Sequence, residues 1–206
     1  MNLNQTNTLR KILADLTSQL QRCKESGIQV QSGILYDEAV LIAEKVMFQP
    51  PADFLEWTIL CNGLSGGSID QVFGLDNVLV DCMNSPEMNW LELNWFPIAS
   101  DGCGSYYAIV PMNHSDGTTR HPVVFLDHEQ SQDKLCDTIT CIVASDFYHF
   151  ISTVIENCVQ ICECVIDGID YDDDTSILIP FHDEKKVLLN DPTINTFGLP
   201  LPWNVP

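Results

Sequence analysis

The fold is most constrained by residues 64–144, where short apolar runs alternate with turn residues and no helical pattern intervenes. The runs cover residues 72–75, 78–80, 93–98, 106–110 and 123–126. Asp101-Gly102 and Asp116-Gly117 are typical turn sequences between them. Strands that follow one another without intervening helices favour a largely antiparallel sheet.

Helical spacing of apolar residues marks both sides of this region. It predicts helices over residues 9–20, 36–47 and 51–63, and a C-terminal helix over 145–165. Pro51 suits a first helical turn, and Ser145 is the predicted N-cap of the last helix. Over 36–47 the predicted inward residues are Tyr36, Ala39, Val40, Ala43 and Val46. The predicted fold is α+β: a largely antiparallel sheet flanked by N-terminal helices and a C-terminal helix.

Two further segments complete the predicted organisation. Residues 62–68 are rich in glycine and are predicted to form a flexible loop, without the lysine that a phosphate-binding loop requires. Residues 196–206 are predicted to lie on the body as an extended segment. A chain of 206 residues suits one domain.

Charge excludes several classes of ligand. The chain has 29 acidic and nine basic residues, a net charge of −20. Residues 1–50 are neutral overall, so residues 51–206 carry the whole charge. This charge repels acidic membranes and nucleic acid, whose binding requires Lys and Arg at the phosphates. The charge serves either solubility alone or a face for a basic partner.

The chain has nine cysteines. The sequence begins without an apolar leader and contains no run of the roughly 20 apolar residues that span a membrane. An odd number of cysteines without an export signal indicates reduced thiols, so we expect a cytoplasmic protein in which several cysteines are buried.

Three segments resemble a known family in their order and spacing. They are WFPIASDGCG (95–104), PVVFLDHE (122–129) and ASDFYHFI (144–151), and they follow a helix that ends at Asn62-Gly63. Together, over residues 36–165, they resemble the SUKH superfamily. The sequence departs from the family at Pro50, where leucine is common, and at Ser105, where an acidic residue is frequent.

The resemblance implies a role in protein binding and supplies no catalytic residues. Fungal members of the superfamily are Smi/Knr regulators of cell-wall synthesis. Many bacterial members are immunity proteins that neutralise polymorphic toxins, often nucleases.

Three patterns resemble chemical sites, each with a structural alternative. Residues 127–129 (Asp-His-Glu) suggest an acid–base cluster, but neighbouring strand residues point to opposite faces, which favours a loop at a strand end. Residues 170–174 place aspartates as in a calcium loop, but Thr175 and Phe181 stand where glycine and glutamate are needed. Cys158 and Cys162 have zinc-ligand spacing but belong to the buried stripe of a helix. We therefore predict no catalytic residue, no cofactor and no metal.

The leading hypothesis is an immunity protein, not an enzyme, that masks the active or substrate-binding surface of a basic toxin. The alternative is a regulatory or scaffolding module with another protein partner. Tyr106 and Trp203 are possible aromatic anchors, and we expect a monomer or weak dimer. The predicted partner-binding residues are Asp170, Asp172, Asp173 and Asp174, followed by Asp76, Asp81, Asp127 and Glu129.

Overall fold

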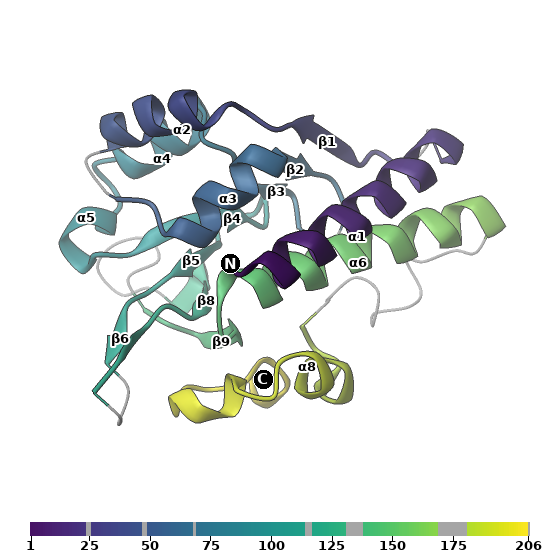
Figure 1. Cartoon of the computed structure of the whole chain (residues 1–206). Coiled ribbons are helices and arrows are strands. Elements are labelled where there is room, and N and C mark those ends of the chain that lie inside the picture. Colours follow the sequence, from purple (N-terminus) through teal and green to yellow (C-terminus); the bar gives the residue numbers. More distant parts are fainter. Residues whose placement is uncertain are drawn as a thin grey trace.

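A seven-stranded antiparallel sheet forms the centre of the computed structural model (Figure 1). The structure describes residues 1–23, 26–46, 49–67, 69–113, 117–130, 138–168 and 181–205. Across the sheet the strands are β1 (Gln29–Ser32), β2 (Cys61–Ser65), β3 (Gln71–Val72), β4 (Phe96–Ser100), β5 (Tyr106–Ile109), β8 (Val123–Leu126) and β9 (Cys141–Ala144). A separate hairpin joins β6 (Met112–Asn113) to β7 (Thr119–Arg120). The predicted α+β fold with an antiparallel sheet is confirmed.

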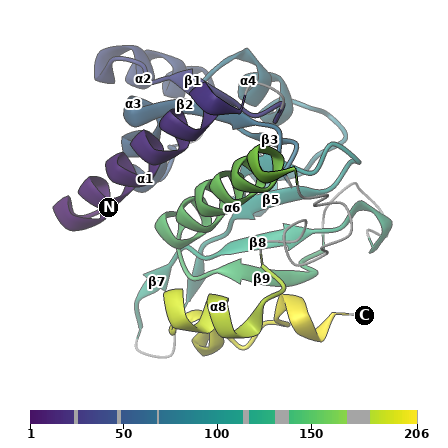
Figure 2. The same ribbon diagram turned by 90° about the vertical axis from the view of Figure 1, so that its right-hand side faces the viewer.

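Two long helices cover one face of the sheet. α1 (Leu3–Arg22) and α6 (Phe147–Asp167) lie side by side and run in the same direction (Figures 1 and 2). Among the described residues, α6 is the one helix long and apolar enough to cross a membrane. Ten of its residues are buried within the protein, as in the core helix of a globular domain. Its N-cap is Asp146, which accepts the His149 N–H, so the predicted cap at Ser145 is one residue too early.

Four shorter helices lie beside β1–β4. They are α2 (Tyr36–Ala43) with the 3₁₀ turn η1 (Glu44–Val46), α3 (Ala52–Leu60), α4 (Asn77–Met83) and α5 (Trp90–Leu93). α3 is anchored by Phe54, whose ring meets those of Phe96 and Phe147 edge-on at centroid distances of 5.0 and 5.5 Å. The predicted inward face of α2 is wrong in part, because Ala39 is buried while Tyr36 is 61% exposed.

The strand predicted at residues 78–80 is wrong, since these residues belong to α4. The Asp76 carboxylate accepts the backbone N–H groups of Val78 and Leu79 and starts the helix. Likewise, residues 93–95 are not strand: Leu93 ends α5, and Asn94 turns the chain in a left-handed conformation (φ 56°) before β4.

The predicted flexible loop at residues 62–68 is also wrong for its first half. Residues 61–65 form β2, which lies between β1 and β3. The Asn62 side chain accepts the Leu75 N–H at 2.7 Å. A side chain on Gly74 would place its Cβ 2.0 Å from the Asn62 carbonyl oxygen. Glycine therefore permits close backbone packing here.

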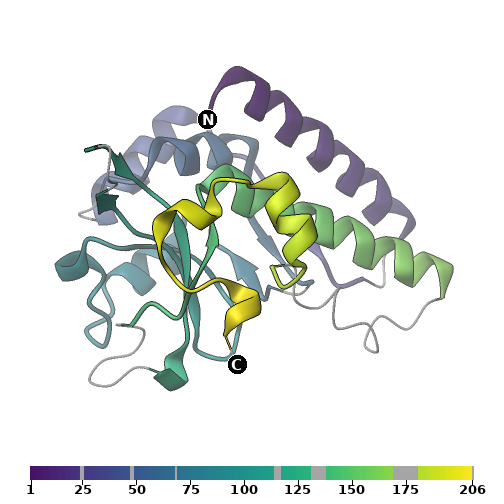
Figure 3. The same ribbon diagram turned by 90° about the horizontal axis from the view of Figure 1, so that it is seen from below.

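The C-terminal segment lies on the body, as predicted, but is coiled. It forms α8 (Glu184–Asn190), η4 (Ile194–Phe197) and η5 (Pro202–Asn204), which face the viewer in Figure 3. The Pro200 carbonyl accepts the Ile142 N–H at 2.9 Å, so the segment covers the edge of the sheet at β9. Val187 and Ile194 form a small apolar cluster with Ile142, apart from the main core.

Candidate protein-binding surface

The predicted partner-binding acids fall into three groups. Asp170, Asp172, Asp173 and Asp174 lie outside the described residues. The other four lie at opposite ends of the sheet. Asp127 and Glu129 follow β8, whose last residue, Leu126, pairs with the first residue of β5. Asp76 and Asp81 lie beyond the other end, where β3 leads into α4. The structure therefore does not bring the four described residues into one site.

Asp127 and Glu129 belong to a turn region with Asp70 and Asp101. The Asp101 carboxylate accepts the backbone N–H groups of Cys103 and Ser105 at 2.8 and 2.9 Å. Asp127 in the same way accepts the Glu129 N–H at 2.9 Å, at the start of η2 (His128–Gln130). These two carboxylates build the turns in which they lie.

The candidate acid–base cluster at residues 127–129 is a loop at a strand end. His128 Nδ1 lies 2.9 Å from the Ser105 hydroxyl and 3.9 Å from the Asp127 carboxylate. Ser105 also accepts the His128 N–H. Within the part of the chain that the structure describes, no three His, Cys, Asp or Glu side chains gather as a metal ion would require.

The helices α2, α4 and α5 lie at the end of the molecule away from the C-terminus of α6 (Figure 1), and they and the N-cap of α2 carry exposed apolar side chains. They are Leu35, Tyr36, Leu41, Val78 and Leu91, between 42% and 77% exposed. Exposed acids on these helices are Asp37, Glu38, Asp81 and Glu92, with Glu44 in η1 and Glu87 between α4 and α5. We call these eleven residues the acidic–apolar face.

The charge of this face is almost uniform in sign. Lys45, exposed in η1, is its nearest basic neighbour in the sequence. From residue 46 to 119 the chain contains no lysine or arginine. Of the predicted binding residues, Asp81 belongs to the face and Asp76 lies at its edge as the cap of α4. The apolar part was missed because helical spacing assigned Tyr36 to the core.

A groove of about 440 Å³ opens between α2 and the start of α3. Tyr36, Val40 and Leu55 give it apolar walls, and Glu44 lies at its side. It offers a concave apolar surface within the acidic–apolar face, of the kind that receives a large side chain of a binding partner.

The predicted aromatic anchors lie elsewhere and are half-buried. Tyr106 packs edge-on against Trp90 at a centroid distance of 5.4 Å. Trp203 packs against the apolar cluster of Ile142, Val187 and Ile194. Both residues stabilise the fold from within, and the exposed aromatic residue on the acidic–apolar face is Tyr36.

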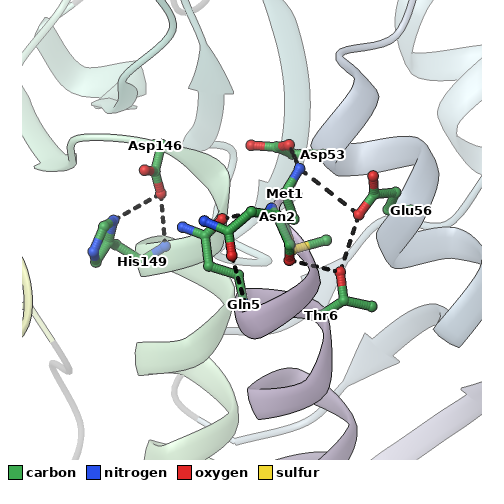
Figure 4. Close-up of polar contacts among 8 residues, drawn as sticks. All are labelled: Met1, Asn2, Gln5, Thr6, Asp53, Glu56, Asp146 and His149. Carbon is green, nitrogen blue, oxygen red and sulfur yellow. Dashed lines mark hydrogen bonds and ion pairs between the residues drawn. The ribbon is translucent and has the colours of Figure 1, made fainter.

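Two separate sets of polar contacts lie at the starts of α1, α3 and α6: one joins α1 to α3, and the other lies within the first turn of α6 (Figure 4). The Met1 ammonium group contacts Asp53 and lies 3.7 Å from Glu56. His149 Nδ1 lies 2.8 Å from Asp146 Oδ1. Burial opposes ionisation of Asp146, but its hydrogen bonds to His149 outweigh burial and lower its pKa. Burial likewise disfavours the His149 cation, but the hydrogen bond and charge of Asp146, aided by Asp191, raise its pKa.

The described cysteines are free thiols. Cys158 and Cys162 are buried on α6, as the structural alternative to a zinc site predicts. Burial raises the pKa of Cys61, Cys141 and Cys158 to about 12. These three thiols are therefore not ionised near neutral pH and are poor nucleophiles.

Comparison of the sequence with known proteins assigns the chain to no family. No protein-family model matches the chain, and no curated protein is similar to it in sequence. The resemblance to the SUKH superfamily stays a prediction.

Proposed function

We propose that this protein binds a basic protein partner through the acidic–apolar face and, as a cytoplasmic immunity protein, masks the partner's working surface. The observation that carries the proposal is the presence of five exposed apolar side chains and six exposed acids on α2, α4, α5 and the residues next to these helices. A patch that serves solubility alone needs the acids but not the apolar side chains.

The two kinds of side chain have separate roles in binding. Acidic residues attract a basic partner over a distance and speed the encounter, an effect that salt weakens. Apolar side chains that enter pockets of the partner supply most of the affinity, as at other protein interfaces. A nuclease toxin has a basic groove for nucleic acid, and an acidic surface with apolar anchors complements such a groove.

The test is a pull-down with the full chain at low and high salt. It compares two variants, in each of which one exposed leucine is replaced by aspartate. Leu41, on α2, is 62% exposed and belongs to the face, whereas Leu189, on α8, is 82% exposed and lies outside it. We expect Leu41→Asp to abolish recovery of a basic partner and Leu189→Asp to leave it unchanged. An acidic partner, or equal recovery with both variants, contradicts the proposal.

The consequence of binding separates neutralisation from regulation. If the partner is a toxin, its activity falls to background when the protein is added in equimolar amount, and Leu41→Asp restores it. A partner whose activity is unchanged by binding contradicts the immunity role and favours the scaffolding alternative.

A further inference from the structure

A second cleft, of about 650 Å³, opens at the end of the sheet where α3 and α6 begin. Phe96, Ile109 and Phe147 line it, and each is at most 2% exposed. The ring of Phe54 packs edge-on against both phenylalanines from behind, which fixes their positions. A cleft of this size, built on well-packed apolar residues, is typical of small-molecule sites.

One wall of the cleft comes from the C-terminal segment, through Thr193 and Phe197. Asp191, which is 3% exposed, holds this wall in place. Its carboxylate accepts the backbone N–H of Ser145 at 2.6 Å and the Thr193 hydroxyl at 3.0 Å. The wall is therefore tied to the start of α6.

The rim of the cleft carries charges of both signs. Arg120 and His121, at the end of β7, line it together with Asp53 and Asp146. Val123 pairs with Ala144 in the antiparallel sheet. His121 lies two residues before Val123 and Asp146 two residues after Ala144, so both come to the same rim. The Asp53 and Asp146 side chains are 33% and 37% exposed, which leaves both open to a ligand.

These charges select the class of ligand. The net charge of −20 disfavours anions such as nucleotides. A wholly apolar ligand would strip water from the charged rim without replacing its hydrogen bonds. A carboxylate can accept several hydrogen bonds, so Asp53 and Asp146 can receive a ligand ammonium group besides their contacts to Met1 and His149.

We infer that this cleft binds a zwitterionic small molecule with an apolar side chain, namely an amino acid or short peptide. The ligand carboxylate lies at Arg120 and His121, its ammonium group at Asp53 and Asp146, and its side chain against Pro111 and Phe197, the partly exposed apolar residues of the lining. The cleft borders the groove of the acidic–apolar face at Gln49, but none of the residues assigned to ligand binding belongs to that face, so this inference does not depend on the proposed function.

Calorimetric titration of the unmodified protein tests the inference with the dipeptide Ala-Phe and three blocked forms. N-acetylation removes the ammonium charge, C-terminal amidation removes the carboxylate, and the third form carries both changes. We expect saturable binding of Ala-Phe and at least about tenfold weaker binding for each singly blocked form, as expected for loss of one charged hydrogen-bonded contact. No saturable binding, or equal binding of the doubly blocked form, overturns the inference.

Two variants of equal charge change locate the site. Arg120→Gln removes the cation from the rim, whereas Lys185→Gln removes an exposed cation on α8 outside the cleft. We expect Arg120→Gln to bind Ala-Phe and its amide equally well, while Lys185→Gln keeps the tenfold preference for the free carboxylate. If both variants keep that preference, Arg120 does not bind the carboxylate and the inference is wrong.

Discussion

The carboxylate of Asp191 accepts a hydrogen bond of 2.6 Å from the backbone N–H of Ser145, 46 residues earlier in the chain. Ser145 directly precedes Asp146, the N-cap of α6, so one buried carboxylate links the C-terminal segment to the start of the central helix. A second backbone contact, from Ile142 to Pro200, ties the same segment to the edge of the sheet. The segment is thus a fixed part of the fold.

Replacing Asp191 by alanine should destabilise the protein by about 2 kcal/mol, because a buried N–H group loses its acceptor. Asp191→Asn should cost about half as much, since the amide oxygen can still accept one hydrogen bond. Urea unfolding measures both. The control Glu184→Ala, exposed on α8, should stay within about 0.5 kcal/mol. Equal stability of Asp191→Ala and the control would show that the contact is not formed.

The His149–Asp146 contact should make stability depend on pH in a defined window. The pKa of His149 is raised above 6.5, so its contribution is complete below pH 6.5 and is lost as the pH rises through the raised value. The pKa of Asp146 is lowered below 3.8, so its contribution is present above pH 3.8 and is lost as the pH falls through the lowered value. The contact therefore stabilises most between these limits.

Urea midpoints measured from pH 4 to pH 9 provide the test, with His149→Gln as the reference. The difference between the two proteins should shrink above about pH 6.5, by less than about 1 kcal/mol because both groups are partly exposed. A titration of His149 by NMR should give a pKa above the ordinary value. A difference independent of pH would contradict the assignment.

The sheet and the long helices were predictable because their patterns are local. Short apolar runs between turn residues predicted strands such as 106–110 and 123–126, and helical spacing predicted α1 and α6. The prediction of a strand at residues 78–80 was wrong because a short apolar run is compatible with either a strand or a helix. The helix is favoured here by the Asp76 side chain, whose hydrogen bonds to the first turn do not appear in the apolar pattern of the sequence.

The prediction of a loop over the residues of β2 was wrong for a different reason. Glycine at 63 indicated a loop, but β2 needs glycine because its neighbour comes unusually close: a Cβ on Gly63 would lie 3.3 Å from the Gly74 nitrogen. Tertiary contacts of this kind leave no pattern in a single sequence. The acidic–apolar face was likewise predicted only in part. The sequence showed the acidic residues, but it did not show which apolar residues of α2 stay exposed.

Gly74→Ala should therefore destabilise the protein by about 3 kcal/mol, since its Cβ would lie 2.0 Å from the Asn62 carbonyl oxygen, and backbone atoms cannot move aside cheaply. Gly117→Ala is the matched control. It has a positive φ of 80° but no atom within 4 Å of its Cβ, so backbone strain alone should cost about 1 kcal/mol. Equal unfolding free energies for the two variants would show that β2 and Gly74 are not in close contact.

The last prediction separates local contact from overall charge at the proposed partner-binding surface. Asp81 and Glu129 are both exposed acids, and replacing either by lysine changes the net charge by the same amount. Asp81 lies on the acidic–apolar face, whereas Glu129 lies at the other end of the sheet. The two variants therefore have the same net charge and attract the partner equally over long distances. A difference between their association rates then shows where the partner docks.

With the partner recovered by pull-down, association rates should be measured at several salt concentrations. Asp81→Lys should slow association by about three- to tenfold at low salt, and the effect should fade as salt rises, because exposed charges are screened. Glu129→Lys should change the rate by less than about twofold, because its charge lies at the other end of the sheet, where it makes no contact with the docked partner. If Glu129→Lys slows association as much as Asp81→Lys, the partner docks at the turn end of the sheet instead.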